Sequence, residues 1–361
     1  MKLASIPTSG QYYAILSSEN WKLSIEELKA VLDVETQHYR LLAALDGLAV
    51  FDSSNIDLYR VVGRAAYTKE IGILLGLAGS SHGCVSRLAD RAIEVLETAK
   101  ASSYERESGF WVFSEDRGPY IRPAGSAELS REIIRRAARL GFRLDKRTPL
   151  VSFRAFSTEG VLALGVVVAR QEGKGYLERS PGRRPFFKPG PLSPRLSRAF
   201  VNLSRLRAGE VFMDPFCGTG GFALEACMVG ASIALCGDLD WRMVEGGPEN
   251  LKRYCPHGTW VYSAWNAGRL PIRSKSIYSI ATDPPYGRST TTGGVGYTYL
   301  VREMLRRSRD ILVDGGWVAF AGPHFRRPEV IATSEGFAVE TVVEMFVHGS
   351  LTRSIVVARI E

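Results

Sequence analysis

The segment with the most specific chemistry is Asp283-Pro284-Pro285-Tyr286, at the end of the apolar run YSIATD. An exocyclic amine on a nucleobase is a weak nucleophile because its lone pair is delocalised into the ring. A catalyst must therefore hold that amine with hydrogen-bond acceptors, in line with a methyl donor. The Asp283 carboxylate and the Pro284 carbonyl can both accept from an NH2 group. Pro284 and Pro285 fix the backbone, and Tyr286 offers a ring on which a base can stack. The competing interpretation is a rigid surface turn, since Pro-Pro is common at strand ends.

A glycine-rich turn, DPFCGTG over residues 214–220, follows the apolar run EVFM. A strand that ends in an acidic residue and continues through such a turn into a helix is typical of nucleotide-type sites. Glycine lets the backbone approach a ligand closely, and such ligands lie at the carboxyl edge of a sheet. A single glycine-rich turn is a weak signal, because it is often only a tight turn.

Asp238 ends the next apolar run, IALCGD, about twenty residues beyond the glycine-rich turn. A carboxylate at this position can accept hydrogen bonds from both ribose hydroxyls of an adenosine. Asp238 could instead be the N-cap of a helix that starts at Trp241, but Asp240 is better placed for that role. Asp238 is therefore predicted to be free for a ligand.

These three segments need a sheet that brings strand ends together. From Ser193 onward, the short apolar runs EVFMD, IALCGD, TWVYS, YSIATD and GWVAF alternate with helical segments, a pattern that predicts a parallel sheet covered on both faces. At the end, FAVETVVEMFV and SIVVARI are joined through HGSLTR without a helix, which predicts a C-terminal antiparallel hairpin. The fold class is α/β, with smaller α+β domains before this sheet.

The N-terminal half shows two α+β units and a connector. Residues 11–70 and 71–165 each contain strand-like and helical runs. The clearest helix runs from about Ala127 to Leu140, with Ser126 as N-cap and Gly141 as the C′ residue. LVSFRAF and VLALGVVVA read as strands around a turn at Glu159-Gly160. Residues 170–192 are rich in glycine and proline and have no periodicity, so a domain boundary is expected there.

Composition favours a multidomain protein with a polyanionic partner. The chain has 361 residues and a net charge of +8. Residues 101–210 hold 21 Lys/Arg against 11 Asp/Glu, so the basic excess lies in the middle third. Concentrated positive charge suggests nucleic acid, although a solvated basic face is the plainer alternative. There is no run long enough to cross a bilayer and no signal-peptide pattern. Five scattered cysteines without a CxxC pair argue against a zinc site and suit a reducing cytosol, so no metal and a cytoplasmic location are predicted.

The two loops resemble those of Rossmann-like amino-methyltransferases that carry a (D/N/S)PP(Y/F) motif. RRPFFKPGPLSPRLSRAFVNLSRL before the first strand and LTRSIVV near the end are similar to the archaeal and eukaryotic tRNA (guanine-10-N2) methyltransferases. The resemblance is closest over residues 183–361. It implies a ferredoxin-like domain over residues 1–70, a THUMP RNA-binding domain over 71–168, a linker over 169–190 and a methyltransferase domain over 191–361.

The resemblance also implies a cofactor, S-adenosylmethionine (SAM), and assigns residues to it. The glycine-rich turn at residues 214–220, called the SAM loop below, supplies Asp214, Phe216, Gly218 and Gly220 around the methionine part. Asp238 meets the ribose and Leu239 lies beside the adenine. Ser193 is expected to contact the SAM carboxylate from the preceding helix. The family usually has Asp-Ala after the third strand, where this chain has Asn266-Ala267. An Asn carbonyl can still accept from the adenine amine, so SAM binding is expected to survive.

RNA contacts are expected from basic residues of the predicted helix and the connector. These residues are Arg131, Arg135, Arg139, Arg183, Arg184, Lys188 and Arg288. For the connector residues, a solvated linker is an equal alternative. Arg288 opens the glycine-containing loop 288–298, which is a candidate lid over the base.

The predicted reaction is SAM-dependent methylation of the N2 amine of a guanosine in tRNA, at position 10 by resemblance, with one or two methyl groups added. Asp283, Pro284, Pro285 and Tyr286 are the catalytic residues. One alternative keeps the chemistry but changes the substrate to DNA adenine N6 or ribosomal RNA guanine N2. Another is a non-catalytic RNA-binding protein that has kept a SAM fold. Some relatives need a small zinc-binding activator subunit, so such a partner is also considered.

Overall fold

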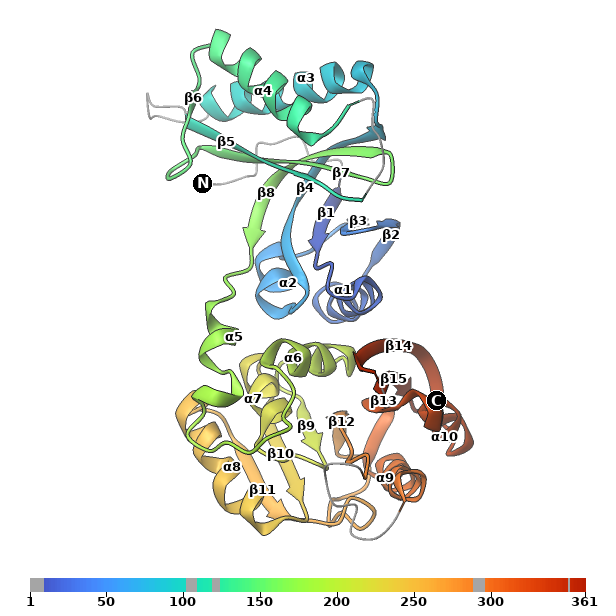
Figure 1. The fold of residues 1–361 in the computed structure, drawn as a ribbon. Coiled ribbons are helices and arrows are strands. Elements are labelled where there is room, and N and C mark those ends of the chain that lie inside the picture. Colours follow the sequence, from blue (N-terminus) through green and yellow to red (C-terminus); the bar gives the residue numbers. More distant parts are fainter. Residues whose placement is uncertain (1–9, 102–108, 119–123, 288–295, 350) are drawn as a thin grey trace. The chain divides into compact units, whose positions relative to one another are not determined.

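The computed structural model describes residues 10–101, 109–118, 124–287, 296–349 and 351–361 (Figure 1). The chain divides into two compact units. The first holds the residues up to Ile25, together with Glu35–Gly63 and Thr68–Gln171. The second holds Glu26–Val34, Arg64–Tyr67 and Glu172–Glu361.

The first unit is built on one eight-stranded sheet with the order β2-β3-β1-β4-β8-β7-β5-β6. All neighbouring strands are antiparallel except β5, which runs parallel to both β6 and β7. The strands are β1 (Gln11–Leu16), β2 (Tyr39–Leu45), β3 (Leu48–Ser53), β4 (Thr68–Gly79), β5 (Gly109–Asp116), β6 (Arg143–Leu144), β7 (Val151–Thr158) and β8 (Val161–Arg170).

Two long helices, α3 (His82–Ala101) and α4 (Ser126–Arg139), pack together and against this sheet (Figure 1). Leu129, Ile133 and Ala137 form the buried stripe of α4 and join a hydrophobic core with β5 and β7. Gly141 has φ +82° and lies just beyond the helix, as predicted. The predicted N-cap is wrong by one residue: Gly125 is the N-cap and makes no side-chain cap, while the N–H of Ser126 donates to Asp116 Oδ1.

The remaining helices of the N-terminal half are α1 (Trp21–Glu35) and α2 (Leu58–Arg64). The predicted turn at Glu159-Gly160 joins β7 and β8, and both residues have positive φ, as a two-residue hairpin requires. The predicted boundary between residues 70 and 71 falls inside β4, which pairs with β1 on one side and β8 on the other. The two predicted N-terminal modules therefore share one sheet, and their limits stay a prediction.

The second unit contains a seven-stranded sheet with the order β11-β10-β9-β12-β13-β15-β14 (Figure 1). The strands from β11 to β13 are parallel, and β15 and β14 form the predicted antiparallel hairpin. They are β9 (Val211–Asp214), β10 (Ile233–Asp238), β11 (Trp260–Ala264), β12 (Ile277–Thr282), β13 (Leu312–Pro323), β14 (Ala338–His348) and β15 (Leu351–Arg359).

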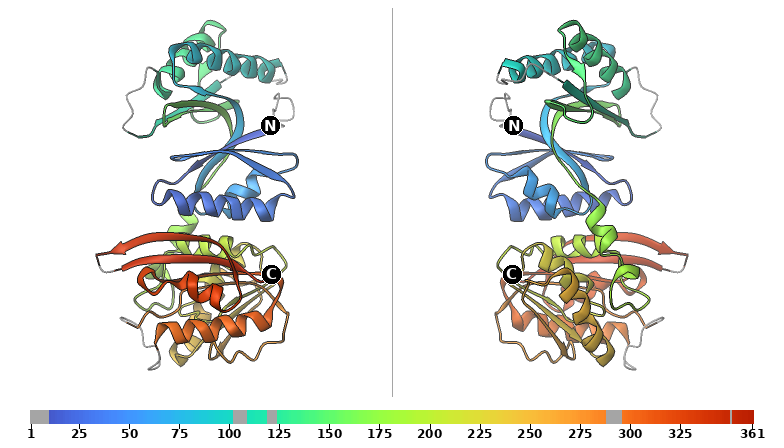
Figure 2. Two further views of the ribbon diagram at one scale, coloured as in Figure 1. Left: turned by 90° about the vertical axis from the view of Figure 1, so that its right-hand side faces the viewer. Right: turned by 90° about the vertical axis from the view of Figure 1, so that its left-hand side faces the viewer.

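Helices cover both faces of this sheet, as the alternating pattern predicts. Figure 2 shows α9 and α10, in orange to red, on one side and α8, in yellow, on the other. The helices are α6 (Pro194–Leu203), α7 (Gly221–Met228), α8 (Trp241–Tyr254), α9 (Tyr297–Ile311) and α10 (Pro328–Ser334), with a 3₁₀ turn at His324–Arg326. The connector before α6 carries a short helix, α5 (Lys174–Glu178), and a 3₁₀ turn at Pro181–Arg183.

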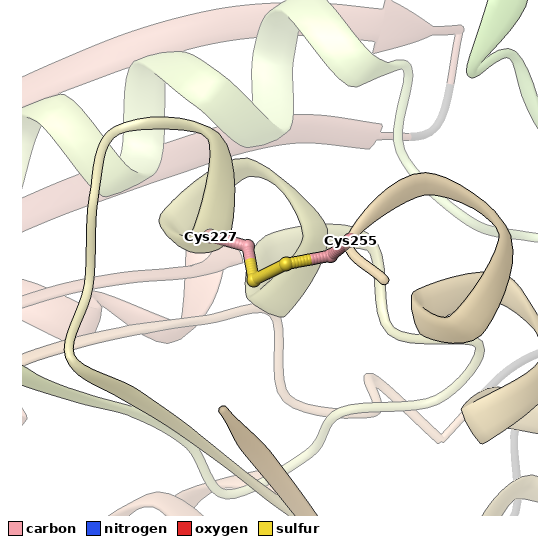
Figure 3. Close-up of a disulfide and its surroundings, with 2 residues drawn as sticks. All are labelled: Cys227 and Cys255. Atoms are coloured by element: carbon pink, nitrogen blue, oxygen red, sulfur yellow. A yellow bond between two sulfur atoms is a disulfide. The ribbon is translucent and has the colours of Figure 1, made fainter. Parts of the chain in front are cut away.

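A disulfide joins Cys227, in the last turn of α7, to Cys255, directly after α8 (Figure 3). The expectation of reduced cysteines is therefore wrong for this pair. The bridge could not be foreseen, because two cysteines separated by 28 residues give no pairing signal in the sequence. Cys84, Cys217 and Cys236 are free and buried. A side chain on Gly258 would collide with both bridging sulfurs, so the chain leaves room for the bridge.

No helix in the described ranges has the length and apolar character to span a membrane. Within the same ranges, no group of three or more His, Cys, Asp or Glu side chains is placed to hold a metal ion.

Candidate active site

The three sequence segments with predicted chemistry meet at the carboxyl edge of the parallel strands. Asp214 ends β9, Asp238 ends β10, and Asp283 directly follows β12. Strand β9 lies between β10 and β12. The chain leaves β9 toward β10 on one side and later returns to β12 on the other, so the order of strands reverses at this point. Such a reversal is where open α/β sheets bind their ligands.

The SAM loop needs its two glycines for different reasons. Gly218 and Gly220 both have left-handed backbone, with φ of +53° and +85°, which disfavours residues with a side chain. A Cβ on Gly220 would come within 2.7 Å of the Tyr262 hydroxyl. A Cβ on Gly218 would meet nothing within 4 Å, so the space in front of this residue is open to a ligand.

Asp214 is fully buried at the base of this loop. Its Oδ1 accepts from the Thr282 hydroxyl at 2.7 Å and from the Phe216 N–H at 3.1 Å, whereas its Oδ2 has no hydrogen-bond partner. Burial raises the pKa of the Asp214 carboxyl to about 7. The Thr282 bond also ties the SAM loop directly to the strand that ends in Asp283.

Asp238 braces the SAM loop from the neighbouring strand. Its Oδ2 accepts from the Gly218 N–H at 2.8 Å, and its Oδ1 accepts from the Asp240 N–H at 2.9 Å. Burial raises the pKa of Asp238, and these two N–H groups oppose the shift. Asp240 is the N-cap of α8, as predicted, because its side chain accepts from the Arg242 N–H.

The predicted adenine-side residues lie on the same edge. Leu239 follows β10 and is 63% exposed, so it presents an apolar side chain to solvent. Asn266 follows β11, where its Oδ1 accepts from the N–H of Gly268 at 2.9 Å. Ala267 is buried. The Asn carbonyl thus closes its own turn and keeps one lone pair for a further donor.

The Asp283-Pro284-Pro285-Tyr286 segment, the predicted catalytic loop, is held by side chains from two other elements. The Tyr286 hydroxyl donates to Asp283 Oδ1 at 2.5 Å. Arg353 of β15 donates from Nε to the Tyr286 hydroxyl at 3.0 Å and from Nη2 to Asp283 Oδ2 at 3.4 Å. The ring of Tyr297, at the start of α9, meets the Tyr286 ring edge-on with centroids 5.9 Å apart.

Burial raises the pKa of Asp283, while the positive charge of Arg353 and the hydrogen bond from Tyr286 lower it. Pro284 is buried, and Pro285 is partly buried. Sequence reasoning missed Thr282, Tyr262, Tyr297 and Arg353. Thr282 and Arg353 carried a signal, since Thr282 precedes the catalytic motif and Arg353 lies within LTRSIVV.

Ser193, predicted to contact SAM, and Arg184, predicted to contact RNA, have different surroundings. Ser193 is exposed and is the N-cap of α6, where its hydroxyl accepts from the Leu196 N–H. Arg184 is only 5% exposed. Its Nε donates to the Arg179 carbonyl at 2.9 Å and its Nη1 to Thr219 Oγ1 at 3.4 Å. Its Nη2 is buried and has no partner.

The predicted phosphate contact of Arg184 does not fit this burial, because a guanidinium enclosed beside Thr219 is not presented at the surface. Lys188 pairs through Nζ with Asp240 Oδ2 at 2.8 Å, next to the N-terminus of α8. Arg183 is exposed. Arg288 and residues 288–295 of the predicted lid lie outside the described residues.

The predicted RNA-binding residues of α4 are exposed in the first unit. Arg131 and Arg135 line a groove between α3 and α4. Arg135 pairs with Glu132 at 2.5 Å, while Arg139 lies in the last turn of the helix. Arg136, by contrast, is partly buried and pairs with Asp90 and Glu132.

Known proteins are similar to this chain in sequence and in fold. A family model described as an RMKL-like methyltransferase domain matches residues 181–355. Among solved structures, TrmN from Thermus thermophilus aligns with a TM-score of 0.53 and 20% identity, over 97% of this chain and all of that one. A possible methylase from Clostridium difficile aligns with a TM-score of 0.52 and 13% identity, over 97% and 98% of the two chains. At these identities the structures establish the fold alone.

Relatives found by sequence similarity identify the family of this chain more specifically than the solved structures do. A tRNA (guanine(10)-N2)-dimethyltransferase from Methanothermobacter thermautotrophicus is 32% identical over 345 residues, which are 94% of this chain and 97% of that protein. A protein of the same description from Pyrococcus abyssi is 36% identical over 53% of this chain and 57% of its own length. The similarity to the first protein spans nearly the whole of both chains, and this chain therefore belongs to the tRNA (guanine(10)-N2)-dimethyltransferase family.

Proposed function

We propose that this chain methylates the N2 amine of guanosine 10 in tRNA with S-adenosylmethionine as the methyl donor. The observation that carries the proposal is the position of the Asp283-Pro284-Pro285-Tyr286 loop beside the SAM loop. The two loops are tied by the hydrogen bond from Thr282 to Asp214. An acceptor pair for an amine and a site for a methyl donor thus share one edge of one sheet.

The residues at the carboxyl edge fit SAM. The methionine part of SAM carries an ammonium and a carboxylate. Asp214 offers a buried carboxylate oxygen without a partner, and Arg184 offers a buried N–H group without one. Opposite charges in a buried site need each other, since an unpaired polar group costs free energy there. We infer that Asp214 faces the ammonium and that Arg184 faces the carboxylate, in place of the RNA contact predicted for Arg184.

When bound, SAM supplies an electrophilic methyl group on its sulfonium. The chain holds the nucleophile: Asp283 and the Pro284 carbonyl accept the two N–H groups of the amine, which localises the nitrogen lone pair. Tyr286 stacks on the base after it leaves its helical stack, a step that costs a few kcal/mol. The amine proton leaves to Asp283 or to solvent. Asp238, Leu239, Asn266 and Ala267 hold the adenosine part.

The basic face of α4 provides affinity for tRNA. Arg131, Arg135 and Arg139 are placed to contact phosphates, and such contacts make binding depend strongly on salt. Replacing all three with Ala should raise the KM for tRNA and flatten its salt dependence. The single-turnover rate at saturating tRNA should stay unchanged. Arg91→Ala on α3 is the control, since Arg91 is also exposed but is not one of the predicted RNA-binding residues. Unaltered salt dependence in the triple variant would remove these residues from the RNA site.

The function is tested with labelled SAM, unmodified tRNA transcripts and nucleoside analysis. N2-methylguanosine or N2,N2-dimethylguanosine is expected, and a transcript with adenosine at position 10 should stay unmethylated. Methyladenosine as the product would favour an adenine-N6 enzyme. Methylation of ribosomal RNA but not tRNA would favour the ribosomal alternative. Asp283→Ala should abolish the product while SAM binding persists, whereas full activity of this variant would refute the proposed role of the loop.

We expect the chain to act in the cytoplasm. We also expect the purified chain to methylate tRNA without a second subunit. Activity that appears only after addition of a small zinc-binding protein would show that this chain needs the activator found with some relatives.

A further inference from the structure

Arg353 is a buried cation with two partners in the catalytic loop. It is 8% exposed, and its guanidinium contacts both the Tyr286 hydroxyl, at 3.0 Å, and Asp283 Oδ2, at 3.4 Å. Its Cζ also lies 5.8 Å from the centroid of the Tyr286 ring. With the bond from Tyr286 to Asp283, the three side chains form a closed triangle in which each one contacts the other two.

The C-terminal hairpin is what brings this cation to the site. Strand β15 runs antiparallel to β13, and Arg353 lies opposite Pro323, the last residue of β13. An antiparallel strand begins at the edge where its parallel neighbours end. The first residues of β15 therefore reach the carboxyl edge, next to the loop that follows β12. The neighbouring residue, Ser354, receives a second contact at this edge, from His324 Nδ1 at 3.2 Å.

We propose that Arg353 is a positioning residue for methyl transfer, whose guanidinium aims the Asp283 carboxylate and the Tyr286 ring at the target amine. The inference rests on the proposed function. Arg353 itself need not touch the base or the cofactor, because it acts through its two partners.

The hydrogen-bond geometry explains why an arginine is needed. The Tyr286 oxygen accepts from Arg353 Nε, so the hydroxyl proton is directed to Asp283 Oδ1. An amine that approaches Asp283 Oδ1 must share or replace this bond. Arg353 then remains as a partner for the Tyr286 oxygen and for Asp283 Oδ2, so neither buried group is left unpaired. Lysine has a compact charge and cannot bridge two acceptors with a planar fork.

The charge of Arg353 also favours the form of Asp283 that accepts hydrogen bonds. Burial raises the pKa of Asp283, and Arg353 lowers it. Among the described residues, the other titratable groups that interact with Asp283 are Tyr286 and Tyr297, and burial raises the pKa of both phenols, so they stay neutral. Arg353 is thus the positive charge that opposes the burial of Asp283. An arginine keeps its charge throughout the physiological pH range.

The test compares Arg353→Met and Arg353→Lys with the wild-type chain in single-turnover methylation of tRNA, from pH 5.5 to 9. Arg359→Met is the matched control, since Arg359 is at the far end of the same strand and lies over Trp317. The Met variant should lose about 100-fold in rate at neutral pH, a loss of the size seen when one preorganised donor is removed. Its affinity for SAM should stay within about twofold of wild type.

The pH profile separates a positioning role from a purely structural one. Without the guanidinium, the pKa of Asp283 rises, so the acid limb of the rate profile should move to higher pH. The Lys variant should recover part of the lost rate, and its acid limb should return most of the way to the wild-type pH. Lysine restores the positive charge but not the planar guanidinium that bridges two acceptors. Binding of S-adenosylhomocysteine to each variant reports whether the variant is folded. If the Met variant does not fold, the Arg353→Lys variant is compared with wild type in its place.

An Arg353→Met chain with the wild-type rate and pH profile overturns the inference. So does an Arg353→Met chain that binds S-adenosylhomocysteine normally and is slower by the same factor at every pH, or, where only the Lys variant folds, an Arg353→Lys chain with the wild-type rate. A wild-type chain that makes no N2-methylguanosine refutes the proposed function instead, and this result is seen before any variant is measured.

Discussion

Replacing Asp214 with Asn should stabilise the ligand-free chain at alkaline pH and weaken its response to ligand. Asp214 is fully buried, and one carboxylate oxygen has no partner. In the wild-type protein this group must be ionised above neutral pH, without a compensating cation. Asn keeps an acceptor at the Oδ1 position for Thr282 and Phe216, but it carries no charge.

The magnitude follows from the raised pKa. Burial takes the pKa of Asp214 from an ordinary value of 3.8 to about 7. The folded chain therefore binds this proton more tightly than the unfolded chain, so its stability falls as pH rises between these two values and levels off above about pH 7. At high pH the cost is about 4 kcal/mol. Between pH 5 and pH 8 the advantage of Asp214→Asn over wild type should grow by about 3 kcal/mol.

The assay is thermal unfolding of both chains at pH 5 and pH 8, with and without S-adenosylhomocysteine, which keeps the ammonium and carboxylate of SAM. An advantage of about 3 kcal/mol corresponds to roughly 6–12 °C in Tm for a unit of this size. The ligand should stabilise the wild-type chain more than the variant, because its ammonium partners the Asp214 carboxylate. Asp314→Asn is the control, since the Asp314 side chain is 86% exposed.

Two results would refute this reasoning. If the Tm of both chains changed equally between pH 5 and pH 8, burial of the ionised Asp214 carboxylate would not lower the stability of the wild-type chain. Equal stabilisation of both chains by S-adenosylhomocysteine at pH 8 would mean that Asp214 does not face the ammonium of the ligand.

Three further changes probe the same unit. Gly218→Ala and Gly209→Ala both place a methyl group at positive φ with nothing within 4 Å, so each should cost about 1 kcal/mol of stability. Only Gly218→Ala should weaken SAM binding in calorimetry, and equal binding by both would argue against a ligand in front of Gly218. Arg184→Met should weaken S-adenosylhomocysteine about tenfold but leave 5′-methylthioadenosine, which lacks the carboxylate, unaffected. A similar loss for both ligands would remove Arg184 from the carboxylate site. Cys227→Ser should lower the unfolding free energy by about 3.5 kcal/mol, the chain-entropy value for a loop of this length. A reductant should lower the Tm of wild type alone, whereas an equal effect on both chains would contradict a formed Cys227–Cys255 bridge.

The sheet and its ligand edge could be predicted because local patterns determine them. Short apolar runs separated by helices specify a parallel sheet, and the residues after each run must then lie on one edge. Asp214, Asp238 and Asp283 are at that edge for this reason. The final hairpin was also predictable, because no helix separates its two strands.

Contacts between distant segments could not be predicted in the same way. Arg353 is 70 residues from Asp283, and only the register of β15 against β13 brings them together. The Cys227–Cys255 bridge depends on how the ends of α7 and α8 pack. The burial of Arg184 could not be predicted for a similar reason, since its sequence context, a glycine- and proline-rich connector, is typical of exposed linkers.

The unsatisfied groups of this site are informative because buried polar atoms normally find partners. Asp214 Oδ2 and Arg184 Nη2 are opposite in charge and lie on different elements around the same glycine loop. The chain could have paired each of them internally, as it pairs Glu225 with Arg179 and Arg198 nearby. At the catalytic loop it does so: Asp283, Tyr286 and Arg353 satisfy one another. The contrast suits two ligands with different needs. A zwitterionic cofactor can supply both missing charges at once, whereas a neutral amine cannot stabilise a buried carboxylate alone and needs a cation already in place.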